Sequence, residues 1–101
     1  MIDLKQEYLE EVKRILRAHV PGCEVRVFGS RVQGQSWKYS DLDLVIVGES
    51  QLDDQNIYEF KDAFSESDLP IMVDVLDWHA IRPQFREMIA KQYQVIQEAQ
   101  I

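Results

Sequence analysis

The sequence has little of several features that define whole classes of protein. It contains one cysteine, Cys23, in 101 residues, so no disulfide can form within the chain, and a fold stapled by disulfides is excluded. No apolar run reaches the about 18 residues that indicate a membrane span. Residues 1–5 lack the basic and apolar progression of a signal peptide. We therefore expect a cytoplasmic protein with no membrane association.

Basic residues are also scarce. The chain has 11 lysines and arginines against 18 aspartates and glutamates, which gives a formal net charge of −7. Such a surface repels phosphate backbones at long range, so direct nucleic-acid binding is not expected unless metal ions reverse the sign of the charge locally. Hydrophobic residues (46%) and charged residues (29%) occur in the proportions of a folded domain rather than a disordered chain.

The hydrophobic pattern predicts one domain, residues 1–101, in which helices and strands alternate. Apolar residues at steps of three and four predict three helices, over 4–19, 52–64 and 83–89. In the last of these, Phe85, Met88 and Ile89 line the expected apolar face. Short β-branched or alternating runs predict four strands, at 25–28, 41–47, 71–76 and 93–96. This order favours an α/β (α+β) fold in which helices cover a small mixed sheet.

Two carboxylates stand at the start of the second predicted strand, in Asp41-Leu42-Asp43. Residues two apart on a strand point to the same face, with Cα atoms roughly 6.5 Å apart. Like charges held that close repel each other and favour protonation unless a cation lies between them. Because their ligands are all oxygens, Asp41 and Asp43 predict Mg²⁺ or Mn²⁺ rather than zinc.

A third carboxylate on the neighbouring strand would complete a site for two metal ions. Asp74 lies between Val73 and Val75 in the third predicted strand, where a charge is costly without a cation or hydrogen-bond donors. Asp77 is the rival for this role, and a simple hydrogen-bonded carboxylate is the other interpretation of Asp74. We favour Asp74, because Asp77 suits a cap or a turn into the last helix.

Gly29 and Ser30 follow the first predicted strand. A glycine there lets the backbone approach a ligand, and the Ser30 hydroxyl and nearby backbone N–H groups suit phosphate oxygens. Arg31 either contacts phosphate as well or is a surface arginine paired with an acid. A phosphate-binding turn that faces a metal cluster predicts phosphoryl-transfer chemistry.

Gly29-Ser30, ten intervening residues and Asp41-Leu42-Asp43 resemble the signature of the polymerase β-type nucleotidyltransferase superfamily. The fuller pattern, Gly-Ser-Arg-Val-Gln-Gly at 29–34 followed by Ser-Asp-Leu-Asp-Leu at 40–44, resembles that of its minimal bacterial members. The resemblance extends from the first helix to the terminal strand. It implies that Ser30 holds the triphosphate of ATP, that Asp41 and Asp43 bind both metal ions, and that the third carboxylate is Asp74.

The minimal members are similar to antitoxins whose partner is a helical HEPN-domain ribonuclease. This resemblance implies transfer of AMP from ATP to a tyrosine of the partner toxin, which silences it. Tyr39 departs from the pattern before Ser40 and leaves the base preference open. One alternative is a noncatalytic antitoxin or scaffold that masks its partner by contact, and another is transfer to a small-molecule hydroxyl. About 100 residues suffice for one small domain, so we expect the acceptor to be a separate molecule.

Overall fold

The computed structural model describes residues 2–100 and is built around one four-stranded mixed sheet with the order β3-β2-β1-β4. β1 is antiparallel to both β2 and β4, whereas β2 and β3 are parallel. The elements along the chain are α1 (Gln6–His19), β1 (Glu24–Phe28), α2 (Ser30–Gln33), β2 (Leu42–Val47), α3 (Asp54–Ser65), β3 (Val73–Asp77), α4 (Pro83–Lys91) and β4 (Gln94–Gln97). The expected small mixed sheet covered by helices is confirmed.

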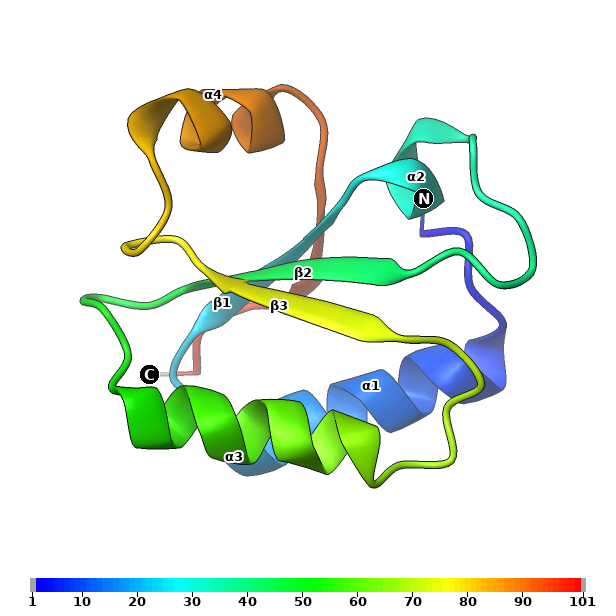
Figure 1. The fold of residues 1–101 in the computed structure, drawn as a ribbon, viewed down its shortest axis with the longest axis horizontal. Coiled ribbons are helices and arrows are strands. Elements are labelled where there is room, and N and C mark those ends of the chain that lie inside the picture. Colours follow the sequence, from blue (N-terminus) through cyan, green and yellow to red (C-terminus); the bar gives the residue numbers. More distant parts are fainter. Residues whose placement is uncertain (1, 101) are drawn as a thin grey trace.

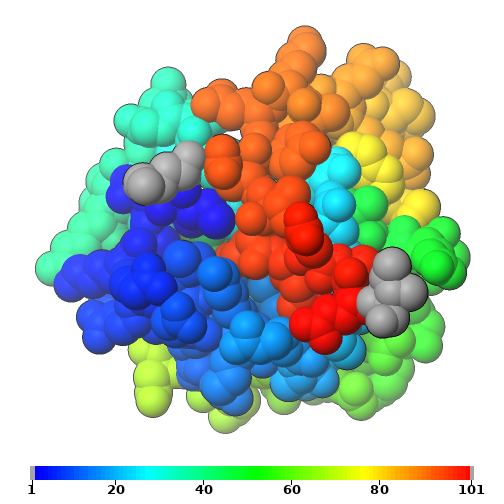
Figure 2. Space-filling model, turned by 180° about the vertical axis from the view of Figure 1, so that it is seen from behind, coloured from blue at the N-terminus to red at the C-terminus, as the bar shows by residue number. Residues whose placement is uncertain are grey.

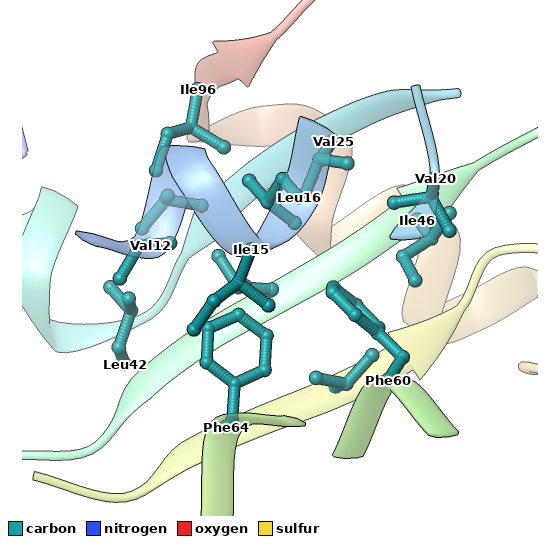
Figure 3. Close-up of a cluster of buried hydrophobic side chains, with 13 residues drawn as sticks. Val12, Ile15, Leu16, Val20, Val25, Leu42, Ile46, Phe60, Phe64 and Ile96 are labelled. Atoms are coloured by element: carbon teal, nitrogen blue, oxygen red, sulfur yellow. The ribbon is translucent and has the colours of Figure 1, made fainter. Parts of the chain in front are cut away.

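The helices α1 and α3 cover one face of the sheet, and α4 lies over the other (Figure 1). The larger core fills the space between the sheet and α1 and α3 (Figure 3). It is built from alternate residues of the strands and from the apolar faces of the two helices, among them Val12, Ile15, Leu16, Val25, Val27, Leu42, Leu44, Ile46, Phe60 and Phe64. Each such side chain stabilises the fold by about 1.5–3 kcal/mol when it is fully buried.

A smaller core lies under α4 on the opposite face. It joins Phe28 of β1, Val45 of β2 and Ile89 of α4. Because successive residues of a strand point to opposite faces, Asp43 shares the α4 face with Val45, whereas Leu42 and Leu44 face α1 and α3. The apolar run of β2 therefore serves both cores, and its single acidic position opens on the α4 side.

The predicted elements are confirmed, with small differences at their ends. β2 begins at Leu42, so Asp41 precedes the strand instead of opening it, and β3 starts and ends later than the predicted 71–76. The apolar face predicted for α4 is only partly buried. Ile89 is 1% exposed, whereas Phe85 is 36% and Met88 is 53% exposed. Of these three residues, only Ile89 packs fully into the core under α4, so the helix turns Phe85 and Met88 partly toward solvent.

Residues 94–100 lie between α1 and α4 on the back of the molecule (Figure 2). There the Gln97 side-chain amide donates to the carbonyl groups of Val20 (2.8 Å) and Cys23 (2.9 Å).

Within residues 2–100, none of the helices has the length and apolar character needed to cross a membrane.

Candidate active site

The turn between β1 and α2 is built around Gly29. Its φ of 81° is a left-handed conformation that favours glycine. A Cβ atom at this position would also collide with the Asp43 carboxylate Oδ2. Both the backbone angle and the space therefore require glycine here, and the turn carries the backbone of Gly29 and Ser30 against the carboxylate of Asp43.

The three candidate carboxylates lie on or beside two neighbouring strands. Asp43 of β2 is paired in register with Asp74 of the parallel strand β3, and neighbouring strands are about 4.8 Å apart. Asp41 precedes β2 by one residue. Burial raises the pKa of the Asp43 carboxyl above its ordinary value, and the negative charges of Asp74 and Asp41 raise it further. The fold therefore brings together three acidic groups that repel one another.

This electrostatic conflict bears on whether the residues fit a metal ion. Among residues 2–100, no three His, Cys, Asp or Glu side chains lie close enough together to hold a metal ion as they stand. The donor set nevertheless consists of carboxylate oxygens, from the register partners Asp43 and Asp74 and from Asp41 just before β2, and oxygen ligands are those that Mg²⁺ and Mn²⁺ prefer. A cation would remove the repulsion that raises the pKa of Asp43. Asp41, Asp43 and Asp74 thus fit the divalent ions expected from the sequence.

Asp77, the rival for the third carboxylate, is occupied elsewhere. It is buried, and its two oxygens accept hydrogen bonds from the backbone N–H groups of Leu52 (2.8 Å) and His79 (3.0 Å). The carboxylate therefore ties the start of the α3 segment to the turn after β3, which agrees with the turn role expected for it. The expected cap of the last helix is not observed, because the N-cap of α4 is Arg82.

Asp74 differs from the expectation in its surroundings. Its preference over Asp77 rested on the cost of a charge buried between valines, but Asp74 is exposed on β3, the edge strand of the sheet. That cost is absent, because water solvates the carboxylate. What distinguishes Asp74 is its position instead, since it lies directly across from Asp43.

Arg31 is not a surface arginine, and it forms no salt bridge among residues 2–100. It is 6% exposed, and its guanidinium donates to the backbone carbonyl groups of Ser40 (2.8 and 3.1 Å) and Asp3 (2.6 Å). Longer bonds reach the carbonyls of Trp37 (3.4 Å) and Lys38 (3.3 Å). The donors expected to contact phosphate are therefore directed at the loop that leads into Asp41.

The sequence of residues 31–40 predicts a short helical turn and then a loop, as observed, but it does not predict that Arg31 braces residues 34–40. Ser40 of this braced loop is buried and accepts a hydrogen bond from the backbone N–H of Trp37 through Oγ (2.9 Å). Arg31 and Ser40 are nine residues apart, and no periodic pattern in the sequence indicates that they bind each other. Ser30 is half-buried at the start of α2, beside Gly29, as expected.

Comparison with known proteins is consistent with this geometry. The family described as polymerase beta, nucleotidyltransferase, matches residues 10–101. The probable protein adenylyltransferase MntA of Haemophilus influenzae is 54% identical over 97 residues, which cover 96% of this chain and 85% of the relative.

Solved structures share the fold at lower identity. A toxin–antitoxin complex with AMP-PNP has a chain that superposes with a TM-score of 0.76 at 22% identity, covering 91% of this chain and 74% of that chain. The complex of the tri-AMPylated HEPN toxin of Shewanella oneidensis with its MNT antitoxin also has a chain that superposes, with a TM-score of 0.70 at 19% identity. The match covers 95% of this chain and 74% of that chain. The family match spans nearly all of the sequence and includes every candidate residue, so this chain belongs to the polymerase β nucleotidyltransferase family.

Proposed function

We propose that this chain transfers AMP from ATP to a hydroxyl group, that of a tyrosine, on a HEPN-type toxin and thereby acts as its antitoxin. The observation that supports the proposal is the register pair Asp43–Asp74, with the Asp43 carboxylate packed directly against the Gly29 turn. The 54% identity to a probable protein adenylyltransferase supports the same reaction. So does the shared fold with an antitoxin whose HEPN partner is AMPylated.

The roles of the residues follow from their placement. Gly29 lets the triphosphate approach the backbone, and the Ser30 hydroxyl donates to its oxygens. Asp41, Asp43 and Asp74 would hold two Mg²⁺ ions, for which Mn²⁺ is a plausible substitute. Such ions lower the pKa of an attacking hydroxyl and neutralise the leaving pyrophosphate. Arg31 acts through the loop it braces, so we assign it a positioning role rather than the phosphate contact expected from sequence.

In the proposed step, the acceptor oxygen forms a bond to the α-phosphorus of ATP, and the bond from that phosphorus to the pyrophosphate oxygen breaks. Asp74 orients or accepts the hydroxyl proton. Its exposure on the edge strand suits this task, because an acceptor from another molecule can reach it there. Asp43 is half-buried, so a protein acceptor reaches it less readily.

The location of the reaction also belongs to the proposal. ATP as substrate and Cys23 as a free thiol are consistent with the reducing cytoplasm. We propose that residues 1–101 act there as one catalytic domain.

The decisive experiment supplies ATP labelled on either the α- or the γ-phosphate to this chain and to the HEPN-type product of the neighbouring reading frame. Label retained on the partner from the α position alone supports AMP transfer. Label from the γ position alone makes the chain a kinase and overturns the proposal. Binding of the partner with no label transferred supports a noncatalytic antitoxin instead.

A matched pair of variants ties the activity to the site. Asp41→Asn with Asp43→Asn should abolish transfer, since amides bind divalent cations poorly. Asp68→Asn removes one exposed loop charge and should transfer at the rate of the unmodified chain. Transfer that survives in the double variant would place the active site elsewhere.

A further inference from the structure

Two aromatic side chains project from the braced loop next to the candidate active site. Trp37 is 65% and Tyr39 is 56% exposed, although packing in the interior or at an interface is the commoner fate of tryptophan. Their rings contact each other edge to face, with centroids 5.5 Å apart. We call Trp37, Tyr39 and the adjacent Lys5 and Lys38 the aromatic patch.

The backbone that carries the aromatic patch is held in place. The buried Arg31 guanidinium binds the carbonyls of Trp37, Lys38 and Ser40 at once. The backbone N–H of Ser40 also donates to the Trp37 carbonyl (3.0 Å). An aromatic pair on an ordered backbone loses little conformational freedom when it binds a partner, which favours affinity. The exposure of these rings is therefore a fixed feature of the surface.

The aromatic patch borders the end of the sheet that carries the carboxylates. Its residues line a cavity of about 390 Å³ that also includes Pro70 and Ile71. These two residues lead into β3, and Tyr39 is separated from Asp41 by Ser40 alone. Because β2 and β3 are parallel, both start at the same end of the sheet. The cavity therefore lies at the end of the sheet where β2 and β3 begin, and Tyr39 in its wall is two residues before Asp41.

The charge of the cavity opposes that of the whole chain. It is lined by three basic side chains, Lys5, Arg31 and Lys38, and by one acidic side chain, Asp3, which accepts a hydrogen bond from Ser36. The Lys5 and Lys38 ammonium groups lie over the rings of Tyr8 and Tyr39, at 5.7 and 5.4 Å from the centroids. The molecule as a whole carries −7. The aromatic patch is thus a local basic surface on an acidic protein.

We propose that the aromatic patch docks an acidic segment of the acceptor protein, with apolar side chains on Trp37 and Tyr39 and carboxylates beside Lys5 and Lys38. This inference rests on the proposed transfer to a protein hydroxyl and names the surface that receives the acceptor. Tryptophan and tyrosine are among the residue types that dominate binding energy at protein interfaces. The triphosphate has its own place at Gly29 and Ser30, so the cavity is free for the acceptor.

The test compares three variants: Trp37→Ala with Tyr39→Ala, Lys38→Glu, and the matched control Tyr58→Ala. Tyr58 is also 65% exposed but lies on α3 and does not line the cavity. For the first two variants we expect the KM for the HEPN-type acceptor to rise at least tenfold, with kcat and the KM for ATP within twofold of the unmodified chain. The control should leave all three constants unchanged. Lys38→Glu keeps both rings, so it tests the surface even where the aromatic double variant loses stability.

Three results would overturn the docking proposal. The first is an unchanged acceptor KM in both variants. The second is a rise confined to the KM for ATP, which would assign the cavity to the nucleotide. The third is an equal effect of Tyr58→Ala, which would make the response general to surface aromatics.

A binding measurement without ATP separates this inference from the proposed activity. In the Asp41→Asn, Asp43→Asn background the acceptor should bind with unchanged affinity, and adding Trp37→Ala with Tyr39→Ala should weaken it at least tenfold. Weakened binding, together with no label transfer by the unmodified chain, would retain the docking surface and discard the enzyme. Label transfer with binding unaffected by the aromatic substitutions would retain the enzyme and discard the docking surface.

Discussion

Replacing Asp43 by asparagine should stabilise the metal-free protein. Asp43 is half-buried, lies directly across from Asp74 and follows Asp41 by two residues. Two unit charges about 6 Å apart repel by about 0.7 kcal/mol in water and by about 2.8 kcal/mol at an effective dielectric constant of about 20. Because Asp74 and Asp41 are exposed and solvent screens them, the lower part of this range applies. We therefore expect Asp43→Asn to raise the free energy of unfolding by about 1 kcal/mol, or Tm by about 4–8 °C.

The pH dependence of this gain has a definite sign. The pKa of Asp43 is raised in the folded chain, so the folded state binds the proton more tightly than the unfolded state does. That contribution to stability is fully present below the unfolded pKa of about 3.9 and is lost as the pH rises through the folded pKa. The advantage of Asp43→Asn should therefore be small near pH 4 and reach its full size at neutral pH.

Thermal unfolding followed by circular dichroism in low salt with EDTA measures this difference, with Asp68→Asn as the control for loss of one negative charge. High salt should reduce the gain, since the Debye length is about 3 Å at 1 M. Addition of Mg²⁺ should raise the Tm of the unmodified chain more than that of the variant, because the cation stabilises the folded state that binds it. A lower Tm for Asp43→Asn at pH 7, or an equal gain from Asp68→Asn, would refute the account of the carboxylate cluster.

Substitutions at three other positions test the surrounding structure. Gly29→Ala should cost at least about 2 kcal/mol, because it adds left-handed backbone strain to a collision with Asp43; a denaturation midpoint equal to that of the unmodified chain would contradict this. Arg31→Gln should cost about 2–4 kcal/mol, since it leaves the buried Ser40 carbonyl and the partly buried Asp3 carbonyl without a charged donor, and Arg31→Lys should recover only part of that loss in a urea titration. Asp77→Ala should cost about 1–3 kcal/mol by leaving the Leu52 and His79 N–H groups unpaired, yet AMP transfer at low temperature should persist; abolished transfer in a folded Asp77→Ala protein would reopen the choice of third carboxylate.

Much of the fold could be predicted because local patterns determined it. The alternation of Leu42, Leu44 and Ile46 identified the face of β2 that meets α1 and α3, and these three residues are fully buried. The spacing of the Gly29-Ser30 pair and the Asp41-Leu42-Asp43 motif identified the β1–α2 turn and the strand beside it. The turn role of Asp77 was also predicted, because an aspartate bonding the N–H two residues later is a local interaction.

The differences arose where contacts between distant segments decide the outcome. Arg31 binds the Asp3 carbonyl, 28 residues away, and the Ser40 carbonyl, nine residues away, and no periodic pattern encodes such pairings. The exposure of Asp74 depends on β3 being an edge strand, which is a property of the strand order. Phe85 and Met88 are exposed because α4 is a short helix on one side of the sheet, whereas its sequence alone indicates only which side is apolar.

The position of β3 at the margin of the sheet bears on how long the proposed catalytic carboxylates stay together. β2 is held by a neighbour on each side, whereas β3 is held by β2 alone. Edge elements open locally at a lower free energy than central strands do. Asp74 can therefore separate from Asp43 while the core around Phe60 and Leu44 remains intact. Amide hydrogen exchange should accordingly be faster along β3 than along β2, and the temperature at which activity is lost should lie below the temperature at which the protein unfolds.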